Sequence, residues 1–278
     1  MMSRVRFETP MKKYPADLIL AARRIMPVAL WLSVLPAAPA ADVASPAAAA
    51  AYDYAEPKLL TGTLYAIGSE RKTVLFTFRR TAACSNAVVR VERRFFETNG
   101  ALAAEEKVVY ASNRLVSFQM QEFQERVSGA VHIEPDLRSP DRQKLFIGFG
   151  RGLTPPKGDA QKLPPDTLID DTLYPFLLAH WDGLMRGDAV KFRFISLEWE
   201  RTFEFRFVKA GESVQRGGPV VQIRMEPTGM FVAKLVDPLV FTVQKNGPHR
   251  ILSYIGRTTP RIKRGKSWKY LDAETVFD

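Results

Sequence analysis

From Lys58 onward, short segments place apolar side chains at every second position, and this alternation limits what the chain can fold into. In KTVLFTFRR, for example, Val74, Phe76 and Phe78 share one face. The same pattern runs through RLVSFQMQEF, VVQIRME and LVFTVQ, and through segments near residues 60–67, 87–96, 105–111, 128–134, 143–149, 250–255 and 268–276. A period of two is typical of antiparallel strands with one buried face. The sequence therefore predicts a mainly β protein.

The stretch KFRFISLEWERTFEFRF (residues 191–207) contains no Gly, Pro or Asn. As a single strand, residues 190–208 would span about 60 Å at roughly 3.3 Å per residue, well beyond the usual strand length. We therefore predict two strands, 189–196 and 201–209, with a tight connection between them. The parity of the apolar positions also changes after Phe194, which predicts a bulge or a bend there. Further along, Lys245-Asn246-Gly247-Pro248 predicts a hairpin turn after LVFTVQ.

One segment has a helical period. After a loop rich in Pro and Gly (residues 153–166), an apolar stripe recurs at the spacing of an α-helix, formed by Leu173, Phe176, Leu177, His180, Trp181 and Leu184. We expect Asp171 or Thr172 to cap the start of this helix and Gly187 to end it. A helix this apolar needs a surface to cover, and the sheet is the available one. The predicted architecture is a large curved antiparallel sheet, a half-barrel or roll, packed on one amphipathic helix. A two-sheet sandwich is the alternative.

The N-terminal region is typical of an exported protein. Arg23-Arg24 precedes the apolar segment IMPVALWLSVLP, and Ala38-Pro39-Ala40 follows it. A basic flank, a short apolar segment and small residues before a cut make a secretory signal peptide. We predict a signal peptide over residues 1–40, a flexible Ala- and Pro-rich leader over 41–57, and one β-rich domain over 58–278. The processed protein is then expected in the periplasm or secreted, and not integral to the membrane.

The net charge indicates which kinds of partner the protein can bind, and the cysteine content indicates whether it can form a disulfide. The formal net charge is +10, and residues 1–40 hold six Lys/Arg against two acids, which leaves +6 for the processed chain. This mild excess suits an anionic envelope surface, whereas nucleic acid is not expected as a partner of an exported protein. With a single cysteine, the chain can form no internal disulfide.

A curved sheet that faces an apolar helix is either filled solid by its side chains or leaves room for an apolar ligand. The abundance of phenylalanine and the export signal favour non-covalent binding of a lipid or another hydrophobic small molecule. For this ligand site we predict two residues of the helix and four of the sheet, namely His180, Trp181, Phe192, Phe203, Phe205 and Phe207. The solid core remains the alternative.

The segment GRTTPRIKRGKSWK near the C-terminus is strongly basic. A basic hairpin loop can dock on anionic head groups or an acidic polysaccharide, and it can equally be a solvated loop. The residues assigned to docking are Arg257, Arg261, Lys263, Arg264 and Lys266. A structural or partner-binding envelope protein that uses this segment is the second hypothesis.

Sequence motifs for catalysis are absent: there is no G-x-S-x-G, no Gly-rich phosphate loop, no H-E-x-x-H and no Cys pair. The three histidines, His132, His180 and His249, lie far apart with no metal-ligand spacing. We therefore predict no catalytic residues, no metal site and no cofactor. A hydrolase built around His180 is kept as a third hypothesis.

Three segments taken together resemble a known group of proteins: FLLAHWDGLMRGDAVKFRF, RMEPTGMFVAKLVDPLVFTV and GPHRILSYIGRTTP. They are similar to an uncharacterised family of exported, β-rich proteobacterial proteins of the domain-of-unknown-function type. The match covers roughly residues 170–260 and departs from the family at Ile255, where an acidic residue is usual. A looser likeness is to periplasmic lipoprotein-carrier half-barrels, in which a curved sheet closes over helices. The resemblance implies a β-rich architecture and export, and no assigned activity.

Overall fold

The computed structural model describes residues 53–278 except positions 216 and 235. The predicted signal peptide and most of the predicted leader lie outside these residues. The end of the leader is described, and there Tyr54 is buried and stacks on Tyr110 with ring centroids 4.0 Å apart. Packing on the sheet therefore begins a few residues before Lys58.

The described strands form one 15-stranded sheet. The first eight are β1 (Leu59–Ala66), β2 (Val74–Ser85), β3 (Val88–Glu97), β4 (Leu102–Ala111), β5 (Arg114–Glu122), β6 (Val127–Asp136), β7 (Ser139–Arg151) and β8 (Asp159–Lys162). The others are β9 (Thr167–Leu168), β10 (Val190–Ser196), β11 (Arg201–Gln215), β12 (Gly218–Pro227), β13 (Leu239–Gln244), β14 (Ile251–Arg264) and β15 (Ser267–Phe277). These bounds confirm the mainly β, single-sheet prediction over the two-sheet sandwich.

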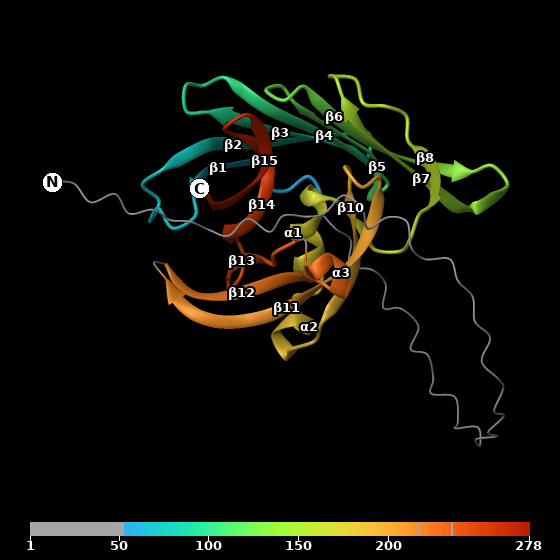
Figure 1. Cartoon of the computed structure of the whole chain (residues 1–278). Coiled ribbons are helices and arrows are strands. Elements are labelled where there is room, and N and C mark those ends of the chain that lie inside the picture. Colours follow the sequence, from blue (N-terminus) through green and yellow to red (C-terminus); the bar gives the residue numbers. More distant parts are fainter. Residues whose placement is uncertain (1–52, 216, 235) are drawn as a thin grey trace, which may run out of the picture. The chain divides into compact units, whose positions relative to one another are not determined.

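The strand order follows the chain in two runs that meet at β1 and β15. From one edge to the other it is β8-β7-β6-β5-β4-β3-β2-β1-β15-β14-β13-β12-β11-β10-β9. Neighbours are antiparallel except β9 and β10, which pair in parallel. Figure 1 shows the sheet curving around α1 (Asp170–Ala179), so the sheet has an inner face that the helix covers.

The two edge strands, β8 and β9, are separated by only the short segment 163–166, yet they form no ladder with each other. The turn between β10 and β11 bridges this gap instead. Gln161 Nε2 donates to the carbonyl oxygen of Glu200 at 2.6 Å, and Phe149 N donates to Glu200 Oε1 at 3.0 Å. Leu197 of the same turn lies over Gly129 of β6, where an added Cβ would come within 2.8 Å of it. The predicted tight connection therefore also links the two edges of the open sheet.

The predicted helix consists of two pieces, α1 and α2 (Trp181–Arg186), separated at His180. Gly187 ends α2 with a positive φ of 96°, as predicted. The cap prediction was wrong: the N-cap is Ile169, and its backbone N–H donates to Thr172 Oγ1 at 2.8 Å. A third, short helix, α3 (Met230–Ala233), precedes β13.

The β10–β11 hairpin has the predicted strands, but not a bulge in its ladder. Phe194 pairs with Phe203 and Ile195 pairs with Thr202 without a shift of register. The change of parity has another cause, because the two faces of β10 pack in different clusters. Phe192 packs with α1 and β11–β13, whereas Ile195 packs with β3–β7.

Arg261 connects the β14–β15 hairpin to segments that are not its neighbours in the sheet. The register between the two strands shifts after Thr258, and Arg261 lies in this irregular part. Its guanidinium lies 2.7 Å from Glu125 Oε2, 3.0 Å from Glu198 Oε1 and 3.7 Å from Glu122 Oε1. Arg261 thus links the hairpin to the end of β5, the β5–β6 turn and the β10–β11 turn.

We predict that Arg261→Met lowers the free energy of unfolding by about 2–3 kcal/mol, because it leaves Glu122 mostly buried without its cation. Lys263→Met is the matched control, since Lys263 lies two residues along the same strand with its side chain exposed. The control should stay within about 0.5 kcal/mol of the parent protein. Urea unfolding measures both, and equal losses would contradict a structural role for the Arg261 cluster.

Candidate functional site

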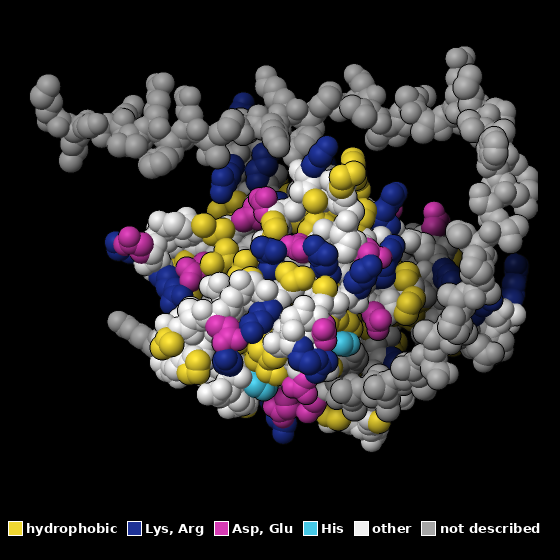
Figure 2. All heavy atoms as spheres, turned by 90° about the horizontal axis from the view of Figure 1, so that it is seen from below, with side chains coloured by type: hydrophobic (Ala, Val, Ile, Leu, Met, Phe, Trp, Pro, Cys, Tyr) yellow, Lys and Arg dark blue, Asp and Glu magenta, His cyan; other side chains and the backbone are white. Residues whose placement is uncertain are grey.

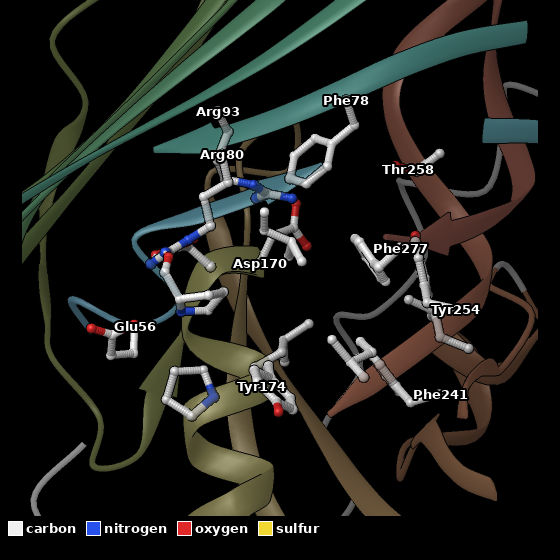
Figure 3. Close-up of a pocket in the computed structure, with 17 residues that line it drawn as sticks. Glu56, Phe78, Arg80, Arg93, Asp170, Tyr174, Phe241, Tyr254, Thr258 and Phe277 are labelled. Atoms are coloured by element: carbon white, nitrogen blue, oxygen red, sulfur yellow. Dashed lines mark hydrogen bonds and ion pairs between the residues drawn. The ribbon is translucent and has the colours of Figure 1, made fainter. Parts of the chain in front are cut away.

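The structure contains a cavity of ≈100 Å³ between α1 and the inner face of the sheet. Its walls come from the segment before β1 and from β1–β3, α1 and β13–β15. The polar and charged residues that line it are Glu56, Arg80, Arg93, Asp170, Asp171, Tyr174, Tyr254 and Thr258. The rest of the lining is apolar or aromatic, namely Pro57, Leu60, Phe78, Leu173, Pro175, Leu239, Phe241, Ile251 and Phe277. Figure 3 shows Arg80, Arg93 and Asp170 together at one end, with Tyr254, Phe241 and Phe277 across from them.

Arg80 and Asp171 form a buried ion pair that attaches the start of α1 to β2. Arg80 Nε and a terminal nitrogen donate to the two carboxylate oxygens of Asp171 at 2.7 and 3.2 Å. Tyr110 Oη also donates to Asp171 at 2.8 Å, and Arg80 donates to the backbone oxygen of Tyr54 at 2.8 Å. Burial alone would raise the pKa of Asp171, but Arg80 and these hydrogen bonds hold it below its ordinary value.

A second buried pair lies beside the first. Arg93 of β3 lies 2.7 Å from Glu106 of β4, whose side chain is 1% exposed. Burial raises the pKa of Glu106 to about 7, although the charge of Arg93 opposes this rise and that of Asp170 adds to it. Burial works against the charge of Arg93, yet the nearby carboxylates, above all Glu106, keep its pKa above the ordinary value.

Asp170 differs from these four groups. It is the first residue of α1, it lines the cavity and its side chain is exposed. Desolvation by the neighbouring protein raises the pKa of Asp170; Arg93 lowers this pKa and Asp171 raises it further.

The structure brings the predicted ligand-binding residues together, but their side chains pack against one another in the hydrophobic core. Trp181, Phe192, Phe205 and Phe207 are all buried, and Phe203 packs against them. The rings of Phe192 and Phe207 have centroids 4.7 Å apart. None of these five, nor His180, is among the residues that line the cavity at Asp170. Their part in ligand binding stays a prediction.

The five residues assigned to anionic docking divide into two groups. Arg261 is held among carboxylates, and Arg257 lies 3.4 Å from Asp272 and 4.4 Å from the ring centroid of Tyr270. Lys263, Arg264 and Lys266 are exposed at the tip of the β14–β15 hairpin, where Lys263 and Arg264 belong to β14 and Lys266 lies in the turn. On the face shown in Figure 2, basic and acidic side chains are interspersed.

His180 shows no arrangement for general base catalysis within the described part of the chain. Its Nδ1 lies 2.9 Å from the carbonyl oxygen of Phe176, and its ring packs on that of Phe176. No carboxylate of the described residues forms an ion pair with it. His249 packs on Trp181, and His132 lies 3.1 Å from Glu134 on β6.

No group of His, Cys, Asp and Glu among the described residues is arranged to hold a metal ion. No helix in residues 53–278, gaps excepted, has the length and apolar character to cross a membrane.

The charged end of the cavity was not predicted, although the sequence contains a signal for it. Arg80 continues the inward alternation of Phe76 and Phe78 on β2, and Glu106 lies between the buried Ala104 and Val108 on β4. A charged side chain at an inward position of a strand has to be paired. Such positions can be found in the sequence, whereas the partner that each one meets cannot.

The fold by itself defines the class of protein, a mainly β protein built on one open, curved sheet. No protein-family model and no curated protein matches the chain. A solved structure that is similar is a β-barrel-like protein of domain of unknown function DUF1849 from Brucella abortus. The two chains are 9% identical with a TM-score of 0.34, and the match covers 79% of this chain and 92% of the other.

We predict that stability falls as the pH rises from about 4.5 to about 7, because Glu106 holds its proton longer in the folded protein than in the unfolded one. Each unit of pKa difference corresponds to about 1.4 kcal/mol. Glu106→Gln should flatten this part of the stability profile, measured by urea unfolding at a series of pH values. Glu105→Gln is the control, since the pKa of Glu105 is lowered in the folded protein, so Glu105 does not hold its proton longer there than in the unfolded chain. An unchanged slope in Glu106→Gln would contradict the assignment.

Proposed function

We propose that this protein binds a small hydrophobic molecule, or the apolar end of a larger one, non-covalently in the cavity between α1 and the curved sheet. The observation that carries the proposal is the cavity itself, with aromatic and aliphatic walls and a charged end. Sites for small molecules commonly combine apolar walls with a few polar groups that fix orientation.

The size of the cavity limits the ligand. Its volume of ≈100 Å³ is below the roughly 300–1,000 Å³ of cavities that hold drug-sized molecules. An entire lipid chain does not fit in this space. A short alkyl or aromatic group does, and a longer ligand would extend out of the cavity.

As to location, we propose that the protein acts in the periplasm or outside the cell after removal of residues 1–40. The support is the presequence, with its basic flank, apolar segment and Ala38-Pro39-Ala40. A hydrophobic ligand in that compartment would come from the envelope or from the medium.

The cavity can be tested by filling it. Ile251 lines it, and Ile255 lies on the same strand, exposed and outside the lining. We expect Ile251→Trp to weaken the binding of hexanol at least about tenfold, because the indole ring takes the space of the ligand. Ile255→Trp should bind like the parent protein. NMR chemical-shift titration measures both, and absence of hexanol binding to the parent protein would refute the proposed function.

A second proposal concerns the hairpin tip: Lys263, Arg264 and Lys266 dock the protein on an anionic lipid surface. It is supported by the exposure of these three side chains at the end of the β14–β15 hairpin. Each basic residue near such a surface contributes about 1 kcal/mol. We expect charge reversal of all three to abolish sedimentation with vesicles of phosphatidylcholine and phosphatidylglycerol at low salt.

The control for this experiment is charge reversal of three exposed lysines elsewhere on the protein, Lys162, Lys191 and Lys234. If both triple variants lose vesicle binding equally, the effect is one of net charge, and the proposal for the hairpin tip fails.

A further inference from the structure

The only cation that acts on the carboxylate of Asp170 in the described part of the structure is Arg93, and Arg93 forms its ion pair with Glu106. Arg80 makes two hydrogen bonds to Asp171, and Arg93 lies 2.7 Å from Glu106. No hydrogen bond or ion pair within the described residues engages Asp170. It faces the cavity beside Arg93, as Figure 3 shows.

The charges at this end of the cavity do not balance. Above pH 7, where Glu106 is ionised, two guanidinium groups, Arg80 and Arg93, stand against the three carboxylates of Asp170, Asp171 and Glu106, so one negative charge is in excess. A carboxylate inside a protein is stable as an anion only if a cation or hydrogen-bond donors accompany it; otherwise it takes up a proton. The arrangement therefore favours one added positive charge at Asp170.

The wall across from Asp170 suits such a cation. The rings of Tyr254 and Phe241 lie there, stacked with centroids 5.5 Å apart, and Phe78 and Phe277 are also part of the lining. Aromatic faces attract organic cations and accept their apolar parts at the same time. The hydroxyl groups of Tyr254 and Thr258 add oxygen atoms that can accept hydrogen bonds.

An anionic head group meets the opposite conditions. Asp170 repels it, and both guanidinium groups at this end are already paired with carboxylates. A fatty acid, for example, would bind only after Asp170 took up a proton. A neutral head group would leave the excess charge uncompensated.

We infer that the ligand carries a protonated amine next to its apolar group, and that its ammonium donates a hydrogen bond to Asp170. This inference rests on the proposed function and narrows the ligand class to small organic amines. A charge-assisted hydrogen bond of this kind is worth about a tenfold gain in affinity or more over a neutral one.

The test compares three probes with the same alkyl chain: hexylamine, hexanol and hexanoate. Dissociation constants are measured by NMR titration of the purified protein at pH 8, where the amine is charged and carboxyl groups are ionised. We expect hexylamine to bind about tenfold more tightly than hexanol, and hexanoate to bind most weakly. In Asp170→Asn the three probes should bind alike, while Asp182→Asn, an exposed position on α2, should keep the preference.

The outcomes separate this inference from the proposed function. If hexanol binds and hexylamine has no advantage, or if hexanoate binds best, the inference fails while the hydrophobic site stands. If none of the three binds, both fail. Should Asp170→Asn not fold, the order of the three probes on the parent protein decides the question.

Discussion

The buried ion pair between Arg80 and Asp171 is the interaction on which the arrangement of the interior depends. A sheet of 15 strands encloses more space than its own inward side chains fill, so a segment of the chain has to enter. α1 is that segment, and its start carries charges that need partners inside. Arg80 on β2 supplies one partner, and Tyr110 on β4 supplies a hydrogen bond. The ion pair thereby fixes where α1 begins and which side of it faces β10–β13.

The gap between the edge strands imposes a second constraint. An unpaired strand edge exposes backbone donors and acceptors, and proteins cover or interrupt such edges. Here the β10–β11 turn does so, with Glu200 bound to β7 and β8 and Leu197 seated on Gly129. Arg261 joins the β14–β15 hairpin to the same turn through Glu198. The β10–β11 turn therefore contacts β6, β7, β8 and the β14–β15 hairpin, which are all remote from it in sequence. The basic hairpin is thus held in part by contacts inside the protein.

The cavity lies between the buried ion pairs at the start of α1 and the packed aromatic rings of the sheet. The phenylalanines of β10 and β11 fill their own cluster, so they leave the free volume to residues of β13–β15 and to the start of α1. Asp170 and Asp171 are adjacent in sequence but differ in environment, because one meets Arg80 and the other borders the cavity. That difference gives the cavity its excess negative charge.

The sequence by itself determined most of the strands, the helical segment, the hairpin turn before β14 and the end of α2 at Gly187, because each depends on local period or local backbone geometry. The two short edge strands were not predicted, and β8 lies inside the predicted loop 153–166. It also indicated one curved sheet over an apolar helix, since a single helical stripe has to cover many half-apolar strands. Only the tertiary structure decided which aromatic residues fill the core, that Arg261 is held among carboxylates, and that Arg80, Arg93, Glu106, Asp170 and Asp171 form one charged cluster. The physical reason is distance along the chain: Arg80 and Asp171 are 91 residues apart, and the alternation of a strand says which side chains point inward, not which charges they meet there.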